Sequence, residues 1–324
     1  MNRFLEEVKI PALSAVTALI LSGCTSSNAI DTAVYANAPA DTFGAKFSED
    51  TKFVAEKGRS AGLALNYGKG TVAKTGEQDF SLKKNDRGGI DVTIEGRDFS
   101  FGEKDKLEPD DEGNVYDFEQ DADGKYAGVF SYTGTLEQAL GEGREGQRYH
   151  RAIGYQIYDG SEPNLRGVAV IGAETPQAAM DALASSAKPI AKYSGTFRVD
   201  SFPTAEFASV SSSRTRVRGD FDMEADFGAG TISGETTYVE AREPGQNDFS
   251  KNDNHFEFSK TDITGNGYEG TVTANGGDAV GKYSGGFYGP SAEEIAGVIS
   301  TEVTYDDDGT YVGIGAFSGA QEAK

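Results

Sequence analysis

Residues 216–227 alternate apolar and polar side chains over twelve consecutive positions. A β-strand points successive side chains to opposite faces, so this pattern predicts a strand with one buried face and one solvated face. The buried face would carry Val217, Gly219, Phe221, Met223, Ala225 and Phe227. The solvated face would carry Arg216, Arg218, Asp220, Asp222, Glu224 and Asp226.

Segments of the same kind fill the remainder of the chain after residue 189, which we predict to be a β-barrel domain spanning 189–324. A turn is expected at Gly228 to Gly230, and the next strand is expected to include Ile232 to Tyr238. Further strands are expected at 192–200, 255–263, 267–275, 279–288, 295–304 and 310–317, with hairpin turns at Asn266-Gly267, Asn275-Gly276 and Asp308-Gly309. Eight strands with short connections predict an antiparallel up-and-down barrel, filled by its own side chains.

The region from 43 to 188 is predicted to be a separate β-rich domain, so the fold class is all-β. Its strand candidates are Leu63 to Leu65, Ile90 to Ile94, Val115 to Phe118, Tyr126 to Tyr132, Ile153 to Tyr158 and Val168 to Ile171. Thr175-Pro176 is typical of a helix start, with a cap residue before a proline in the first turn. A short Ala-rich helix is therefore expected from Gln177 to Ala187, between the two domains.

One short motif of the form K-Y-[SA]-G-x-F occurs at 125–130, 192–197 and 282–287. Tyr and Gly lie two residues apart, on one face of a strand, where Gly leaves room for a neighbouring ring. We interpret the motif as a favoured strand sequence, and as a hint that both domains are related β-structures.

The single cysteine, Cys24, follows an apolar stretch and the run Leu21-Ser22-Gly23. This pattern is typical of a bacterial lipobox, in which small residues give signal peptidase access to the bond before a lipid-bearing cysteine. We therefore expect residues 1–23 to be a lipoprotein signal peptide and residues 24–42, rich in Ser, Thr, Ala and Asn, to be a tether. An Asp directly after the lipid-bearing cysteine often signals retention in the inner membrane. Because Thr25 occupies this position, we expect the protein at the outer membrane.

The formal net charge is −22. A field of this sign repels nucleic acid and attracts basic surfaces, so nucleic acid is excluded as a partner and a basic patch on a protein partner is favoured.

The run from Tyr283 to Gly297, with Gly289-Pro290 between two strand patterns, resembles the barrel signature of the transferrin-binding protein B family of surface lipoproteins. That family also includes single-lobed haemoglobin-receptor lipoproteins. Gly167 to Gly172 with Thr175-Pro176 is similar to the end of the family's handle domain. The resemblance implies a handle-like domain before an eight-stranded barrel, and Pro290 to Glu294 is expected to form one helical turn before a strand that starts at Ile295.

The chain has room for one handle-and-barrel lobe, whereas the best-known members have two, and its first domain carries no transferrin-contact motif. The resemblance therefore supports the fold and a surface location. For the partner it implies an iron- or haem-carrying protein of a host or of the environment, and it leaves the ligand-binding residues open.

No motif in the sequence supports an enzyme, a cofactor or a metal. Gly141 to Gly146 and Gly265 to Gly270 match G-x-G-x-x-G, but neither opens a predicted helix, so both are interpreted as loops or hairpins. His150 and His255 are isolated, and each is expected to be a satisfied or surface histidine. Two acidic runs before glycine, Asp121 to Gly124 and Asp306 to Gly309, lack the further ligands of a calcium loop and are interpreted as turns.

Three functions compete at this stage: a surface binding module, a structural or immune-evasion lipoprotein, and a membrane-spanning barrel. The third is rejected because the lipobox already supplies an anchor and because Gly319 to Lys324 follow the last strand. For a binding module, contacts are expected from exposed loops, since a rigid barrel positions loops well. The candidate loops are 103–113, 141–146 and 243–254.

The lipid anchor leads to a direct prediction. Cleavage should fall before Cys24, and the new terminus should carry several acyl chains, because a single chain binds a membrane only marginally. Mass spectrometry of the mature N-terminal peptide should show this modification. An unmodified Cys24 or a retained Met1 would contradict it.

Overall fold

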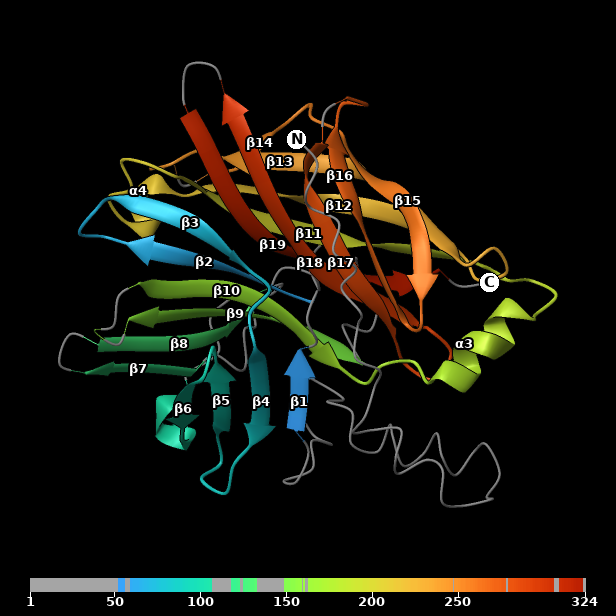
Figure 1. Ribbon diagram of the computed structural model, residues 1–324, viewed down its shortest axis with the longest axis horizontal. Coiled ribbons are helices and arrows are strands. Elements are labelled where there is room, and N and C mark those ends of the chain that lie inside the picture. Colours follow the sequence, from blue (N-terminus) through green and yellow to red (C-terminus); the bar gives the residue numbers. More distant parts are fainter. Residues whose placement is uncertain are drawn as a thin grey trace, which may run out of the picture.

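The computed structural model describes residues 52–55, 59–106, 118–122, 125–132, 149–158, 160, 163–246, 248–277, 279–305 and 309–322. These residues form three β layers: an outer sheet, a middle sheet and a barrel (Figure 1). The predicted all-β architecture, a β-rich domain followed by an eight-stranded antiparallel barrel, is confirmed.

The barrel is a ring of eight antiparallel strands. They are β11 (Ile190–Pro203), β12 (Thr215–Asp226), β13 (Thr231–Arg242), β15 (Phe256–Thr264), β16 (Gly267–Ala274), β17 (Ala279–Tyr288), β18 (Glu294–Tyr305) and β19 (Gly309–Gln321). Consecutive strands pair, β19 pairs with β11, and β12 pairs with β13, so the ring closes. The two-residue strand β14 (Ser250–Lys251) adds to β13 outside the ring.

Aromatic rings fill the barrel. Phe221 is fully buried and lies edge-on to Phe258 and Phe317, with ring centroids 5.9 and 5.8 Å apart. The predicted faces of β12 are confirmed: Gly219, Phe221, Met223 and Ala225 are buried, whereas Asp222 and Glu224 are exposed. Alternation along β12 therefore does place the apolar side chains inside.

The first domain, the handle, consists of two sheets. The middle sheet has the strand order β3-β2-β10-β9-β8-β7, and the outer sheet has the order β1-β4-β5-β6. The strands are β1 (Lys52–Ala55), β2 (Ser60–Asn66), β3 (Thr71–Gly76), β4 (Phe80–Lys84), β5 (Ile90–Ile94), β6 (Arg97–Phe101), β7 (Phe118–Ala122), β8 (Lys125–Ser131), β9 (His150–Tyr158) and β10 (Asn164–Gly172). A 3-10 turn, η2 (Glu103–Asp105), follows β6.

Each face of the middle sheet packs against another layer. One face contributes Val129, Tyr155 and Ile157 to the core that it shares with Leu82 and Val92 of the outer sheet. The opposite face packs its apolar residues against the outer wall of the barrel. The middle sheet is therefore covered on both sides, and β9 and β10 are buried along almost their whole length.

The connecting helix, α3 (Gln177–Ala184), begins at Gln177 as predicted but ends three residues early. Its N-cap residue is Pro176 and not Thr175. Thr175 instead lies buried against the barrel, where its backbone N–H donates to the carbonyl of Phe287 at 2.9 Å. Thr175 therefore makes a contact between the two domains and does not cap the helix, although its residue type favours the N-cap position.

Two turn predictions also need correction. The turn between β15 and β16 is centred on Gly265-Asn266, because the left-handed residue is Gly265 (φ 63°), one position earlier than expected. Pro290 to Ala292 form turns, no helix is present between β17 and β18, and β18 begins at Glu294. In contrast, Asn275 and Gly276 both have positive φ (52° and 69°), as the predicted Asn-Gly hairpin requires.

The repeated glycines leave room for rings of neighbouring strands. Gly195 lies under the ring of Phe221, and Gly285 lies under the ring of Tyr268, so a Cβ at either position would clash. Both Phe221 and Tyr268 belong to the barrel core. The predicted role of Gly in the repeat is therefore confirmed for these two copies.

Two substitutions on β12 test the inside and outside of the barrel. Phe221→Asp should prevent folding, because it places a carboxylate among buried aromatic rings at a cost of several kcal/mol. Asp222→Ser, one residue away on the exposed face, should leave the midpoint of urea unfolding nearly unchanged. Circular dichroism of the full chain in urea would measure both. A cooperative transition in Phe221→Asp close to that of the wild type would contradict this assignment.

Candidate binding site

The handle and the barrel meet along a continuous contact surface, which we call the seam. Side chains of β2, β9 and β10 pack there against the outward face of β11, β18 and β19. The buried apolar residues of this surface include Leu63, Val168, Val170, Phe202, Val298, Val312 and Ile314. The seam also holds three groups of polar contacts, which determine what it can do chemically.

The first group is the arginine cluster, four arginines around the buried carboxylate of Asp200. Asp200 is fully buried on β11 and faces the handle. Its Oδ2 lies 2.9 Å from Arg166 Nη2 of β10 and 3.2 Å from Arg198 Nη2 of β11. Its Oδ1 lies 2.9 Å from Arg216 Nε of β12, and Arg214 Nη1 lies 3.6 Å from Oδ2. One carboxylate therefore joins three strands of two domains.

The arginines of this cluster determine the ionisation of Asp200. Burial of Asp200 would raise its pKa, but the surrounding arginines, Arg198 foremost, hold the pKa well below the usual range. Burial lowers the pKa of Arg214 to about 10, while Asp200 opposes the shift. Asp200 therefore stays ionised at neutral pH and can pair with the arginines of both domains.

The pH dependence follows from the depressed pKa of Asp200. Such a group contributes stability above its unfolded pKa of about 4, and this stability is lost as the pH falls through the folded pKa. The link between handle and barrel should therefore weaken only in strong acid.

The second group links His150, Glu294 and Ser318. His150 Nδ1 lies 2.7 Å from Glu294 Oε2, and its Nε2 lies 2.6 Å from the hydroxyl oxygen of Ser318. The arrangement has the connectivity of a Ser–His–acid triad, but His150 and Ser318 are each only 1% exposed. A substrate cannot reach Ser318 there, so the three residues connect β9 to β18 and β19. Both ring nitrogens of His150 have hydrogen-bond partners, so the prediction that this histidine is either satisfied in its hydrogen bonds or on the surface is confirmed.

The third group surrounds Arg59, just before β2. Arg59 pairs with Glu174, and its Nη2 donates to Asn266 Oδ1 at 2.9 Å. Asn266 belongs to the G-x-G-x-x-G run of Gly265 to Gly270, which the structure places in the β15–β16 hairpin. The hairpin interpretation is confirmed, because this run anchors the handle rather than opening a helix.

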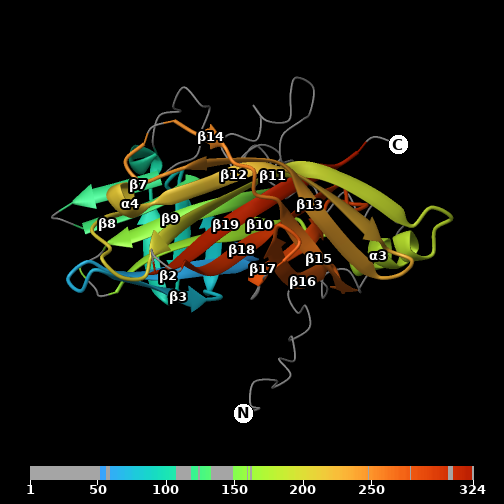
Figure 2. The ribbon, with the colours of Figure 1, turned by 90° about the horizontal axis from the view of Figure 1, so that it is seen from above.

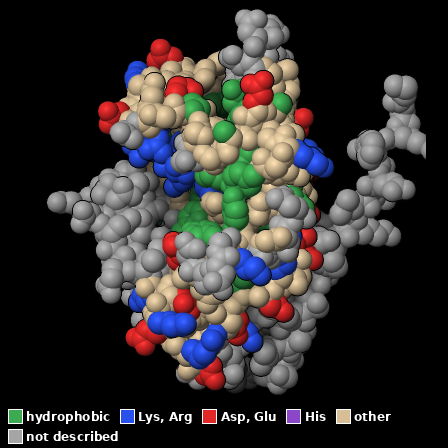
Figure 3. All heavy atoms as spheres, turned by 90° about the vertical axis from the view of Figure 1, so that its left-hand side faces the viewer, with side chains coloured by type: hydrophobic (Ala, Val, Ile, Leu, Met, Phe, Trp, Pro, Cys, Tyr) green, Lys and Arg blue, Asp and Glu red, His purple; other side chains and the backbone are tan. Residues whose placement is uncertain are grey.

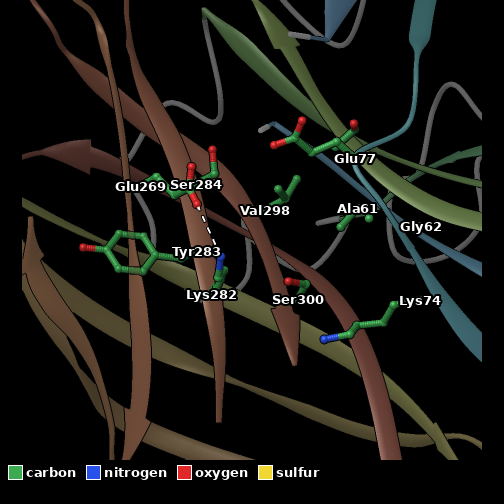
Figure 4. A pocket seen from close by; sticks show the side chains of 12 residues that line it. Ala61, Gly62, Lys74, Glu77, Glu269, Lys282, Tyr283, Ser284, Val298 and Ser300 are labelled. Carbon is green, nitrogen blue, oxygen red and sulfur yellow. Dashed lines mark ion pairs between the residues drawn. The ribbon is translucent and has the colours of Figure 1, made fainter. Parts of the chain in front are cut away.

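A groove runs along the seam between the β2–β3 hairpin and β16, β17 and β18 (Figure 4). It encloses about 230 Å³. Lys74 and Glu77 project from the handle side, and Glu269 and Lys282 lie on the barrel side, with 3.9 Å between Lys282 Nζ and Glu269 Oε1 (Figure 4). Because both signs of charge line both walls, the groove has no single charge preference.

Connections from both domains gather at one end of the molecule, which we call the rim. Among the described residues it consists of the β2–β3 turn (67–70), the β11–β12 connection (204–214) with the short helix α4 (Val210–Ser213), and the described part of the loop 243–254. The handle strand ends and α4 lie together there, with α3 at the opposite end (Figure 2). Gly70 accepts a hydrogen bond from the backbone of Phe207 at 2.8 Å, so the two domains are also joined at the rim.

Aromatic rings and arginines lie side by side at the rim. The half-buried rings of Tyr67 and Tyr158 lie 5.0 Å apart, and Tyr67 lies 5.1 Å from the buried ring of Phe207. The guanidinium of Arg166, which is buried, lies over the rings of Phe130 and Phe202. Figure 3 shows Lys and Arg side chains beside a hollowed strip of hydrophobic atoms on this face. Aromatic and arginine side chains are the types enriched at the centres of protein interfaces.

The structure places one predicted loop at the rim. In the loop 243–254, the guanidinium carbon of Arg218 lies over the ring of Phe249, 3.7 Å from the centroid of that ring. Of the loop 103–113, the described part is η2 and Lys106, next to β6 and β7. The loop 141–146, Cys24, the tether and Asp306 to Asp308 lie outside the described residues. His255, a surface histidine as expected, pairs with Glu235 at 3.2 Å.

The arginine cluster was not predicted from the sequence. The signal was present in Arg214, Arg216 and Arg218, three arginines at alternating positions in an acidic chain. Alternation correctly assigned Arg216 and Arg218 to the outward face, which was interpreted as solvated. Part of that face is covered by the handle, and no local pattern marks such a surface.

The described part of the chain contains no group of three or more His, Cys, Asp or Glu residues that could hold a metal ion. Nor does any helix in this part have the length and apolar character needed to cross a membrane.

Comparison with known proteins gives a family assignment for the barrel. Residues 186–321 match the family described as the C-lobe and N-lobe β-barrels of Tf-binding protein B. Neisserial heparin binding antigen from Neisseria meningitidis serogroup B is 36% identical over 105 residues, which cover 32% of this chain and 18% of that protein. The match therefore spans about a fifth of the length of the curated relative.

Solved structures of low sequence identity also align. Transferrin Binding Protein B from Haemophilus parasuis aligns with a TM-score of 0.44 at 16% identity, over 82% of this chain and 45% of that one. The haemoglobin receptor HpuA from Kingella denitrificans aligns with a TM-score of 0.42 at 14% identity, over 89% of this chain and 90% of that one.

The family match covers the closed ring from β11 to β19 and includes the run from Tyr283 to Gly297 on which the resemblance rested. Through this match, the barrel, residues 186–321, is assigned to the family of Tf-binding protein B β-barrels.

Proposed function

We propose that this protein is a non-catalytic binding module, held at the outer membrane by lipid on Cys24, whose rim captures an iron- or haem-carrying protein. The observation that carries the proposal is the composition of the rim. Connections of the handle and the barrel form one surface, and the buried polar contacts of the seam hold the two domains in a fixed relation.

Rigidity matters because a preformed surface loses little conformational entropy on binding. The half-buried rings of Tyr67 and Tyr158 and the partly exposed Arg214 at the rim are suited to a protein partner, and the loop 243–254 adds exposed acidic groups. The partner class follows the family description, Tf-binding protein B. The non-catalytic role is supported by the sealed position of Ser318, which prevents the Ser–His–Glu arrangement from acting on a substrate.

Binding can be tested with purified residues 25–324 and with transferrin, haemoglobin and haem as separate ligands. We expect saturable binding to one of them, with an association rate that falls as salt rises, because a protein of charge −22 is steered toward a basic patch. Calorimetry and surface plasmon resonance at low and physiological salt would measure this. If neither these ligands nor a serum or medium pull-down gives saturable binding, the structural or immune-evasion alternative is favoured.

Matched charge reversals locate the binding surface. Glu243→Lys with Asp248→Lys changes two exposed acidic groups at the rim, and Asp222→Lys with Glu224→Lys changes two exposed acidic groups on the barrel wall. Both variants alter the net charge equally. The rim variant should weaken binding about tenfold or more, equivalent to about 1.4 kcal/mol, while the wall variant should bind nearly as the wild type does. Equal losses in both would contradict binding at the rim.

A further inference from the structure

The groove on the seam is a cavity that the proposed binding at the rim does not use. It lies between the β2–β3 hairpin and the outer wall of β16, β17 and β18, and it encloses about 230 Å³ (Figure 4). Drug-sized ligands occupy pockets of about 300 Å³ or more. The volume of the groove therefore suits a smaller ligand, of the size of one sugar ring or one amino acid.

The deepest part of the groove is apolar and its lining is small. Ala61 of β2 and Val298 of β18 line it from the handle side and the barrel side, and they are only 3% and 4% exposed. Gly62 and Gly76 add no side chains, and a Cβ at Gly76 would meet no atom within 4 Å. The space beside the handle strands is therefore open, and the C–H surface of a ligand can pack against Ala61 and Val298.

Polar side chains form two neighbouring rows on the barrel wall of the groove. In one row, Ser284 of β17 pairs with Glu269 of β16 on one side and with Val298 of β18 on the other. In the next row, Lys282 of β17 pairs with Ser300 of β18. The Cβ atoms of such cross-strand neighbours lie about 5 Å apart. Hydrogen-bond donors and acceptors are therefore spread evenly over a small area of rigid sheet.

The charged side chains of the groove are already engaged. Lys74 Nζ lies 2.7 Å from Glu302 Oε2 of β18. Lys282 Nζ lies 3.9 Å from Glu269 Oε1, and Glu77 is engaged as well. Because two lysines and two glutamates line the groove, an ion of either sign would meet repulsion as well as attraction. The lining therefore favours a ligand without net charge.

The hydroxyl groups of Ser284 and Ser300 are available to a ligand. Both side chains are half-buried, and neither hydroxyl has a hydrogen-bond partner among the described residues. A serine hydroxyl donates one hydrogen bond and accepts others, while a carboxylate only accepts and an ammonium only donates. Side by side, these groups match a ligand whose own polar groups both donate and accept.

We propose that the groove binds one neutral sugar unit, whose ring packs against Ala61 and Val298. The sugar hydroxyls, each of them a donor and an acceptor, bond to Ser284, Ser300 and the Lys282–Glu269 pair. A free amino acid is also small enough, but its ammonium and carboxylate groups would have to compete with ion pairs that are already formed. The site does not depend on which protein the rim captures.

The neutral probes are D-glucose, D-galactose and D-mannose, titrated into the purified full chain and followed by saturation-transfer difference NMR. D-Glucuronate and D-glucosamine carry one negative or one positive charge on the same ring in slightly acidic buffer, and alanine represents a free amino acid. We expect a saturable signal for at least one neutral sugar and weaker signals for the three charged probes. If no neutral sugar gives a saturable signal, or if a charged probe binds as tightly as the best neutral sugar, the proposal is overturned.

Removal of the two hydroxyls tests the location of the site. Ser284→Ala with Ser300→Ala leaves the shape of the groove nearly unchanged, and the loss of hydrogen bonds should weaken sugar binding about tenfold. Ser233→Ala, at a half-buried serine of β13 outside the groove, is the matched control and should bind as the wild type does. Unchanged binding in the double variant would place the sugar elsewhere and overturn the assignment.

Two single substitutions test the charge balance of the groove. Glu269→Gln removes one negative charge and should shift the preference from the neutral sugar toward D-glucuronate, whereas Lys282→Met should shift it toward D-glucosamine. Both side chains are mostly exposed, so neither change endangers the fold. A purely structural role of these residues would not produce opposite shifts. If the preference stays the same in both variants, or moves in the same direction, the sugar does not bind between these walls.

Discussion

The buried contact between Asp200 and its arginines is the interaction on which the joined structure depends. It connects β10 of the handle with β11 and β12 of the barrel. Removing one partner from a buried ionic group is strongly destabilising, because the remaining charges are left uncompensated. The apolar seam supplies the area of contact, while this directional network fixes how the two domains sit against each other.

Much of the barrel could be predicted from the sequence, because its pattern is local. A strand that buries one face must alternate, and 279–288 was predicted with the bounds that the structure has. The handle was harder: β1, β3, β4 and β6 were missed. Strand β3 buries a single residue, so its sequence carries almost no alternation. The strands β9 and β10, covered on both faces, were found only in part.

The candidate site was much less predictable, because its residues meet only through the tertiary fold. Arg166 and Asp200 are 34 positions apart, and His150 and Ser318 are 168 apart. Each residue is unremarkable in its local sequence: an arginine on an apolar strand, a lone histidine, a serine near the end of the last strand. Only the packing of two separately folded surfaces makes them partners, and single-sequence patterns contain no information about that packing.

Closure of the barrel has a consequence for how this protein misassembles. Every strand of the ring has two neighbours, so its backbone offers no template for another chain. Within the described residues, the strands with one unpaired side are the two-residue strand β14 and the outermost strands of the handle sheets, β3 and β7 in one and β1 and β6 in the other. Strand β3 is largely solvent-exposed and carries Lys74, features that discourage edge-to-edge aggregation. Domain swapping or fibril formation in a destabilised variant would therefore begin in the handle, while the barrel stayed monomeric.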